Sequence, residues 1–488
     1  MLFNSHIFLF AFLPLTLLGF FALGASGRVR AAGLWLTFAS LFFYGWWNPR
    51  YLILIAGSVL FNYQMGVWIA NAVTAGNPRR ARAFLTLGVA TNITLLGYFK
   101  YSRFLVATAA SVAGTHWHLP PIALPLAISF FTFTQIAYLV DAFHGRTREY
   151  DLLHYGLFVT FFPHLIAGPI VLYRSLMPQF ARPETYRFQA ENFARGLTLF
   201  ICGLAKKVII ADNLSPVATA VFGHAASGAS PGLSTAWVGA IAYSLQLYFD
   251  FSGYSDMAIG LARMFNTQFP LNFDSPYKAS DIIDFWRRWH ITLSTFLRDH
   301  LYIPLGGNRH GSIRRYLNLF ITMALGGLWH GAGWTFVIWG CLHGCYLCMN
   351  HAWLHFTRDR AWARTRAARL AGWALTLLAV MVGWVFFKAA SVSVAWQMLR
   401  GMAGLQGRGA STPITAEQAA ILLLAAILAL FAPNTNQILR AAQPPKETAE
   451  ATPPLWQWTP LGAVTLSVVF LLSVLHLSRI SEFLYFQF

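Results

Sequence analysis

Two histidines lie in apolar stretches of the chain where acid–base chemistry is possible. His330 ends a stretch in which the residues at four-residue steps are polar or glycine: Asn318, Thr322 and Gly326. On a helix these residues share the face of His330, so that face carries polar side chains or bare backbone. A neutral imidazole can take a proton from a hydroxyl and return it, as acyl transfer from a thioester to an alcohol requires. The alternative is close helix packing through glycine, with His330 hydrogen-bonded to a carbonyl group.

The second histidine, His290, lies within residues 281–299, a segment rich in aromatic and basic side chains. As one helix, this segment places His290, Ser294 and Arg298 on one line at four-residue spacing, and Trp286 lies beside the histidine. The same pattern is typical of an interfacial helix that lies on lipid headgroups.

Basic residues continue through and beyond this segment. Asp284 can pair with Arg287 or Arg288 one helical turn on. Further basic residues follow: Arg309, Arg314 and Arg315. Because guanidinium groups bind phosphate through two parallel hydrogen bonds, the cluster could bind a phosphorylated donor such as coenzyme A. Anchoring to lipid headgroups is the alternative.

Two carboxylates, Asp250 and Asp256, stand at the end of an apolar run. A carboxylate at membrane depth costs several kcal/mol unless it faces a water-filled cavity or a partner. Asp250 therefore either lines a cavity or caps a helix, whereas for Asp256 we favour helix capping.

The elements that position these residues are expected to be membrane helices. Of the 488 residues 57% are hydrophobic and only 11% are charged, whereas about 25% are charged in soluble domains. This composition excludes an ordinary soluble protein, and the 42 Phe residues argue against disorder. We attribute the net charge of +18 to cytoplasmic loops and anionic headgroups, not to nucleic-acid binding.

Runs of about 17–25 apolar residues are long enough to cross a bilayer. The predicted spans are 7–24, 31–47, 51–72, 83–99, 194–212, 232–250, two within 316–356, 367–390, 417–433 and 457–478. Two more apolar stretches, 120–143 and 153–173, are interrupted by proline and predict broken segments. Basic loops that contain Arg28, Arg79 and Arg358 are placed in the cytoplasm, which puts the N-terminus outside.

Three cysteines share one helical face: Cys341, Cys345 and Cys348. With His343 or His351 they could form a metal cluster. We favour helix packing through small, soft side chains, because the ligand spacings of zinc sites are not present.

Beyond single motifs, the chain resembles the membrane-bound O-acyltransferase superfamily, most closely its bacterial branch that contains the alginate O-acetylase membrane subunit. A lone Trp-His-Gly at residues 329–331 would be weak, but matching stretches follow in order along essentially the whole chain. They are residues 1–5, 97–101, 161–170, 203–207, 249–256, 269–271, 285–307, 326–334 and 485–488.

The resemblance implies an all-α polytopic membrane protein, a bundle of roughly a dozen transmembrane helices with re-entrant segments and a central tunnel. We expect one integral-membrane domain over residues 1–488, with the motif-rich catalytic core at about 125–345. On the family's motifs His330 is the catalytic histidine and His290 a second histidine tied to activity. Residues expected to bind the donor or line the tunnel are Asp250, Trp286, Arg287, Arg288, Ser294, Arg298, Arg309, Asn318, Thr322 and Trp329.

The activity implied by the resemblance is transfer of an acetyl group from a cytoplasmic donor, with acetyl-CoA expected, for O-acetylation of an extracytoplasmic polysaccharide of the alginate type. We expect no tightly bound cofactor, metal or nucleic acid. The expected setting is the lipid of a bacterial inner membrane, with a separate periplasmic acetyltransferase-type protein as partner. One alternative is a relative of the teichoic acid D-alanyl transferases that uses a carrier-protein thioester. Another is a non-enzymatic transporter of lipid or sugar.

Overall fold

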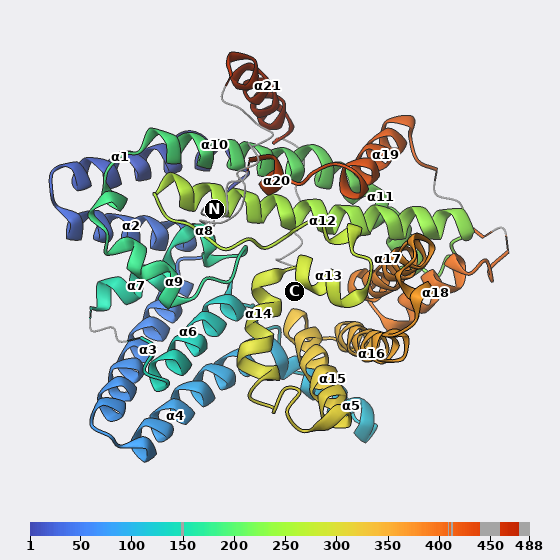
Figure 1. Cartoon of the computed structure of the whole chain (residues 1–488), viewed down its shortest axis with the longest axis horizontal. Helices are drawn as coiled ribbons and strands as arrows, with labels where there is room; N and C mark the ends of the chain where they lie inside the picture. The colour runs from blue at the N-terminus through green and yellow to red at the C-terminus, as the bar shows by residue number, and fades with distance from the viewer. Residues whose placement is uncertain (148–150, 408, 411–412, 440–458, 478–488) are drawn as a thin grey trace. The chain divides into compact units, whose positions relative to one another are not determined.

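A computed structural model describes residues 1–147, 151–407, 409–410, 413–439 and 459–477 (Figure 1). The described residues contain no β-strand, only an isolated bridge between Pro231 and Ala410. The prediction of an all-α protein is therefore confirmed. The C-terminal matching stretch, residues 485–488, lies outside the described residues.

The chain divides into two compact units. One consists of Met1–Phe200 and Asp256–Pro270, the other of Ile201–Ser255 and Leu271–Phe488. The first contains α1 (Leu13–Ala25), α2 (Val29–Gly45), α3 (Tyr51–Thr74), α4 (Pro78–Leu96), α5 (Ser102–Ala113), α6 (Ile128–Phe143), α7 (Leu152–Thr160), α8 (Phe162–Leu165) and α9 (Tyr173–Phe180). Within it α4 packs against both α3 and α6 (Figure 1). The expectation of a single domain stays a prediction.

The second unit contains both candidate histidines, His290 and His330. Its helices are α11 (Asp212–Ala226), α13 (Ile282–Arg288), α14 (Ile291–Leu297), α15 (Gly311–His330), α16 (Trp334–Thr357), α17 (Arg366–Lys388), α18 (Val392–Met402), α19 (Ala416–Leu430), α20 (Thr435–Leu439) and α21 (Pro460–His476). Two helices, α10 (Ala190–Ala205) and α12 (Leu233–Met264), contribute residues to both units.

Some of the predicted spans are confirmed as long apolar helices. Three helical stretches among the described residues are long and apolar enough to cross a membrane: Phe8–Ala25, Tyr51–Thr74 and Arg366–Lys388. Four shorter apolar helices are α2, α6, α19 and α21. The predicted interruptions are also present, because α6 starts only after the proline-rich stretch and residues 153–173 break into α7, α8 and irregular backbone.

Capping residues explain where helices begin. The Asn77 side chain accepts a hydrogen bond from the backbone N–H of Arg80 at 3.0 Å, and Pro78 occupies the first turn of α4. In the same way Thr365 accepts from the backbone N–H of Ala368 at the start of α17, at 3.2 Å. Both helices carry arginines near their start, Arg79 and Arg80 on α4 and Arg366 and Arg369 on α17.

The prediction of one helix over residues 281–299 is wrong. The segment forms α13 and α14, and between them His290 adopts a left-handed backbone conformation with φ of 43°. Asn272 explains the break, because its backbone carbonyl accepts from Ile291 N–H at 3.0 Å and its side-chain oxygen accepts from Thr292 N–H at 3.3 Å. These tertiary hydrogen bonds replace the intrahelical ones of a continuous helix.

The expectation that Asp256 caps a helix is also wrong. The apolar run predicted to end at residue 250 continues as α12 to Met264, so both Asp250 and Asp256 lie inside the helix. Both side chains are buried, at 2% and 4% exposure. Asp250 can remain within the helix because an ammonium group from another segment pairs with it, as described below.

Helices α15 and α16 form a tight pair that carries His330 at the end of its first member (Figure 1). Gly327 and Gly340 stand at the contact. A Cβ on Gly327 would lie 2.3 Å from the carbonyl oxygen of Phe336, and one on Gly340 would lie 2.4 Å from that of Met323. Glycine is thus required for the two backbones to approach this closely.

Candidate active site

His330 is the last residue of α15 and is held among aromatic rings. Its ring centroid lies 4.8 Å from that of Trp329, 5.1 Å from Trp339 and 5.2 Å from Phe387. The side chain is 9% exposed. Both contacts from α16 and α17 are edge-to-face, an arrangement that fixes the plane of the imidazole.

His290 is fixed by Asn272, a residue that the sequence analysis did not single out. The Asn272 side-chain oxygen accepts from the Thr292 backbone N–H and also from the Thr292 hydroxyl, the latter at 2.8 Å. A backbone N–H can only donate, so the amide orientation is set, and His290 Nδ1 at 3.1 Å from the same oxygen must carry a proton. The other nitrogen, Nε2, is then the basic one.

Burial also keeps His290 uncharged. The residue is 1% exposed and lies between α13 and α14, outside the predicted spans. Burial lowers the pKa of His290 to about 3. The imidazole is therefore neutral at physiological pH, and its unprotonated Nε2 can accept a hydrogen bond.

Trp329 lies between the two histidines. Its ring centroid is 6.5 Å from that of His290 and 4.8 Å from that of His330. Trp329 is itself 5% exposed. The structure thus brings the two predicted catalytic residues and one predicted tunnel residue to one buried place in the second unit.

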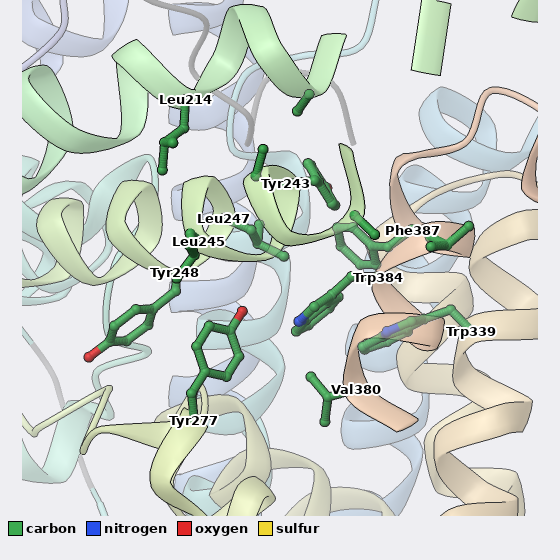
Figure 2. Close-up of a cluster of buried hydrophobic side chains, with 14 of the residues drawn as sticks. Leu214, Tyr243, Leu245, Leu247, Tyr248, Tyr277, Trp339, Val380, Trp384 and Phe387 are labelled. Carbon is green, nitrogen blue, oxygen red and sulfur yellow. The ribbon is translucent and has the colours of Figure 1, made fainter. Parts of the chain in front are cut away.

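A second aromatic layer reaches the site from His343. The Trp286 indole N–H donates to His343 Nδ1 at 3.3 Å, and Trp339 lies 4.9 Å from His343 and 5.1 Å from His330. Figure 2 shows Trp339 of α16 close to Trp384 and Phe387 of α17, with which its ring packs. Trp286 is thereby connected to His330 through His343 and Trp339.

The predicted polar face of α15 is confirmed as buried. Asn318 and Thr322 are 1% and 6% exposed on the face that ends at His330. Asn318 donates to the Gly307 carbonyl at 2.9 Å, and Thr322 donates to the Asn318 carbonyl at 2.7 Å. Asn318 therefore fastens the loop before α15 to the helix that carries His330.

The space beside the glycines near His330 is filled by neighbouring helices, so these glycines do not leave open space around the imidazole. A Cβ on Gly331 would lie 2.2 Å from the Phe336 ring, and Gly327 is in contact with α16. Gly326 faces Leu297, 3.3 Å from the position of a Cβ. Packing alone accounts for these glycines.

The predicted donor-binding arginines are not gathered at the histidines. Arg287 and Arg309 are exposed. The other two form local ion pairs at 2.8 and 2.7 Å: Arg288 with Asp284, and Arg298 with Asp299. Ser294 is half-buried and donates weakly to a backbone carbonyl, that of Trp289, at 3.4 Å. Arg288 and Arg298 are thus engaged by neighbouring carboxylates, and Arg287 and Arg309 are exposed.

Asp250 belongs to a separate buried cluster. Its carboxylate pairs with Lys207, which also pairs with Asp212 at 2.8 Å. Lys207 is 1% exposed. Because this cluster holds the aspartate, the carboxylate of Asp250 is engaged by a cation and not by either histidine.

No group of three or more metal-ligating side chains occurs among the described residues. All four cysteines are free thiols. His343 contacts Trp286 and four other aromatic rings, those of Phe285, Trp339, Tyr346 and Trp384. The interpretation of residues 341–351 as a packing face is consistent with these contacts.

Sequence reasoning missed Asn272, Lys207 and Trp339, and it treated His343 only as a metal-cluster candidate. Lys207 lies inside one of the matching stretches, and a lysine in an apolar run is itself a signal of a buried ion pair. Asn272 carried no such signal, because it lies in a loop and its partners are 17–20 residues away.

Comparisons with known proteins fit this arrangement. Residues 143–393 match the model of the membrane-bound O-acyltransferase family. The chain is 45% identical to the peptidoglycan O-acetyltransferase of Helicobacter pylori, over 83% of this chain and 80% of that protein. It is 41% identical to a probable alginate O-acetylase of Azotobacter vinelandii over the full length of both. A teichoic acid D-alanyltransferase of Lacticaseibacillus rhamnosus is more distant, at 26% identity over 62% of this chain and 75% of that protein. The chain belongs to the membrane-bound O-acyltransferase family and is an O-acyltransferase.

Proposed function

We propose that the protein takes an acetyl group from acetyl-CoA on the cytoplasmic side of a bacterial inner membrane and passes it outward for O-acetylation of a polysaccharide. The observation that carries this proposal is the pair of buried histidines, His290 and His330, on either side of Trp329. Alginate-type exopolysaccharide is the favoured polymer, since a full-length relative is a probable alginate O-acetylase. Peptidoglycan is the second candidate, because another relative acts on it.

The proposed chemistry needs one base and no covalent enzyme intermediate. His330 takes the proton of the acceptor hydroxyl while the hydroxyl oxygen attacks the thioester carbonyl carbon. The new C–O bond forms, the C–S bond breaks, and the proton held on His330 passes to the departing thiolate. His290 is kept neutral by burial and held by Asn272 with its proton on Nδ1, so its Nε2 serves as a hydrogen-bond acceptor and not as a second base.

The proposed topology has about a dozen spans, re-entrant segments and a central tunnel, with the N-terminus in the periplasm. The basic loops at Arg28, Arg79 and Arg358 support this orientation, because cytoplasmic loops carry an excess of basic residues. In the proposed arrangement the donor enters on the side of the exposed Arg287 and Arg309, whose charges attract the phosphates of coenzyme A.

A separate periplasmic acetyltransferase-type protein is the proposed partner, because the acetyl group must still reach a polymer outside the membrane. The D-alanyl alternative has weaker support, because this chain is less similar to the teichoic acid D-alanyltransferase than to the alginate O-acetylase relative. If the D-alanyl alternative is correct, a carrier-protein thioester replaces acetyl-CoA as the donor. A transporter would consume neither the carrier-protein thioester nor acetyl-CoA.

The test uses purified full-length protein in lipid nanodiscs with acetyl-labelled coenzyme A and a small hydroxyl acceptor. Wild type should release free coenzyme A and acetylated acceptor, and His330→Ala should reduce the rate by at least about 100-fold. His355→Ala is the matched control, because His355 is exposed on α16, and it should retain wild-type turnover. Turnover that survives His330→Ala would overturn the catalytic assignment. Consumption of D-alanyl carrier protein with acetyl-CoA left intact would overturn the donor.

A further inference from the structure

One face of α4 in the first unit forms a groove that none of the proposed acetyl-transfer chemistry uses. Its volume is about 830 Å³, and it is a shallow depression open to the surroundings and lined by residues of α4 alone. The lining residues recur with helical spacing: Arg79, Arg82, Ala83, Thr86, Leu87 and Ala90. All of them are exposed.

The two arginines at one end of this groove, Arg79 and Arg82, have no acidic residue close to them in the sequence. The first acidic residue of the sequence is Asp141, so the first 140 positions contain only basic charges. Neither Arg79 nor Arg82 forms an ion pair within the described part of the chain. Two guanidinium groups one helical turn apart therefore present their donors to an external anion.

Toward the other end the groove becomes apolar. Ala83 and Ala90 are small and flank Leu87, which is 52% exposed, so their short side chains leave a furrow along the helix. The hydroxyl of Thr86 is the remaining polar group along this face. A ligand that fits must be anionic at one end and hydrocarbon along the rest.

We propose that this groove binds one anionic phospholipid. The phosphate lies between Arg79 and Arg82, and an acyl chain follows Ala83, Leu87 and Ala90 along α4. Coenzyme A offers phosphates as well, but it carries no long hydrocarbon chain that would follow the apolar part of the groove. The site is independent of the proposed acyl transfer, because it uses no residue of the histidine site.

The experiment measures lipid retention by the full-length protein. Protein purified from phosphatidylcholine nanodiscs that contain a minor share of phosphatidylglycerol is released in the mass spectrometer, and bound lipids are identified by mass. Wild type should keep one phosphatidylglycerol in preference to phosphatidylcholine. Arg79→Gln with Arg82→Gln should weaken that binding roughly 30-fold, as expected for the loss of two basic side chains near an anionic headgroup.

Two further variants distinguish binding in the groove from non-specific attraction between arginines and anionic lipid. Arg366→Gln with Arg369→Gln removes two exposed arginines at the same spacing in the first turns of α17, away from the residues that line the α4 groove. That variant should keep the lipid. Ala83→Phe fills the furrow without a change in charge and should also release the lipid.

Several results would overturn the proposal. They are equal retention of phosphatidylcholine and phosphatidylglycerol by wild type, equal loss in the α4 and α17 double variants, and unchanged retention in Ala83→Phe. Displacement of the bound lipid by acetyl-CoA would assign the groove to the donor. A thermal unfolding curve for each variant shows that it is folded, so a loss of lipid reports on the groove and not on unfolding.

Discussion

The Trp286 indole N–H donates a hydrogen bond to Nδ1 of His343 across 3.3 Å, between residues 57 positions apart in the chain. His343 is fully buried, and Gly383 lies against it, since a Cβ there would be 2.9 Å from Nε2. Trp339 packs between His343 and His330. This relationship connects α13, α16 and α17 directly behind the candidate catalytic histidine.

We predict that His343→Leu lowers both stability and turnover, whereas His343→Asn retains most of both. Leucine leaves the buried Trp286 N–H without its acceptor, at a cost of about 1–3 kcal/mol. Asparagine can place its amide oxygen near the position of Nδ1 and accept the same hydrogen bond. Thermal unfolding in detergent and kcat with acetyl-CoA provide the two measurements. Equal losses in the two variants would show that the hydrogen bond is not the relevant interaction.

A second prediction concerns the hydrogen bond between Asn272 and His290. Asn272→Leu removes the acceptor of Nδ1–H and should lower kcat by roughly 10- to 100-fold with little change in KM, because the residue orients His290 and does not bind substrate. Asn272→Asp keeps the acceptor and adds a negative charge, which raises the pKa of His290 from its burial-lowered value of about 3.

The sign of the pH effect follows from that shift. In wild type His290 stays neutral down to about pH 3, so it contributes no acid limb near neutrality. In Asn272→Asp the imidazole gains a proton at higher pH, so activity should fall as pH decreases through the raised pKa. The measurement is kcat/KM from pH 5 to 9. An acid limb at the same pH in both proteins would contradict the proposed role of Asn272.

The buried cluster of Lys207, Asp212 and Asp250 predicts how strongly three substitutions lower the free energy of unfolding. Lys207→Met removes the cation that pairs with both carboxylates and should cost about 3–5 kcal/mol. Asp250→Asn leaves the Lys207–Asp212 pair intact and should cost less. Glu191→Gln, which removes a partly exposed ion pair with Arg195, should cost under about 1 kcal/mol. Chemical denaturation of the three variants measures the order, and a larger loss in Asp250→Asn than in Lys207→Met would contradict it.

The contact between α15 and α16 gives a further prediction. Gly327→Ala places a methyl group 2.3 Å from the Phe336 carbonyl oxygen and must separate the helices. We expect a loss of about 1–3 kcal/mol and reduced turnover, because His330 lies at the end of α15. Gly57→Ala on α3 is the matched control, since nothing lies within 4 Å of its Cβ. It should be neutral or slightly stabilising by helix propensity. The comparison is made by thermal unfolding and by kcat.

The sequence by itself determined the membrane class and the all-α fold, and it singled out the two histidines as candidates. It also determined the face of α15, because Asn318, Thr322 and His330 repeat at the period of a helix. These features depend on composition or on spacing within one segment, where residues a few positions apart must be neighbours. The same reasoning located the proline interruptions near residues 120–125 and 163–169.

Only the tertiary structure decided how His290 is held, what pairs with Asp250 and why His343 is buried. Asn272 breaks the predicted helix at His290 from 18 residues away, and Lys207 reaches Asp250 from another helix. His343 meets Trp286 across 57 positions. Hydrogen bonds and ion pairs of this kind depend on which segments pack together, and no local period records that choice. The sequence therefore identified the candidate histidines, while long-range packing set the tautomer of His290 and the burial and neighbours of both.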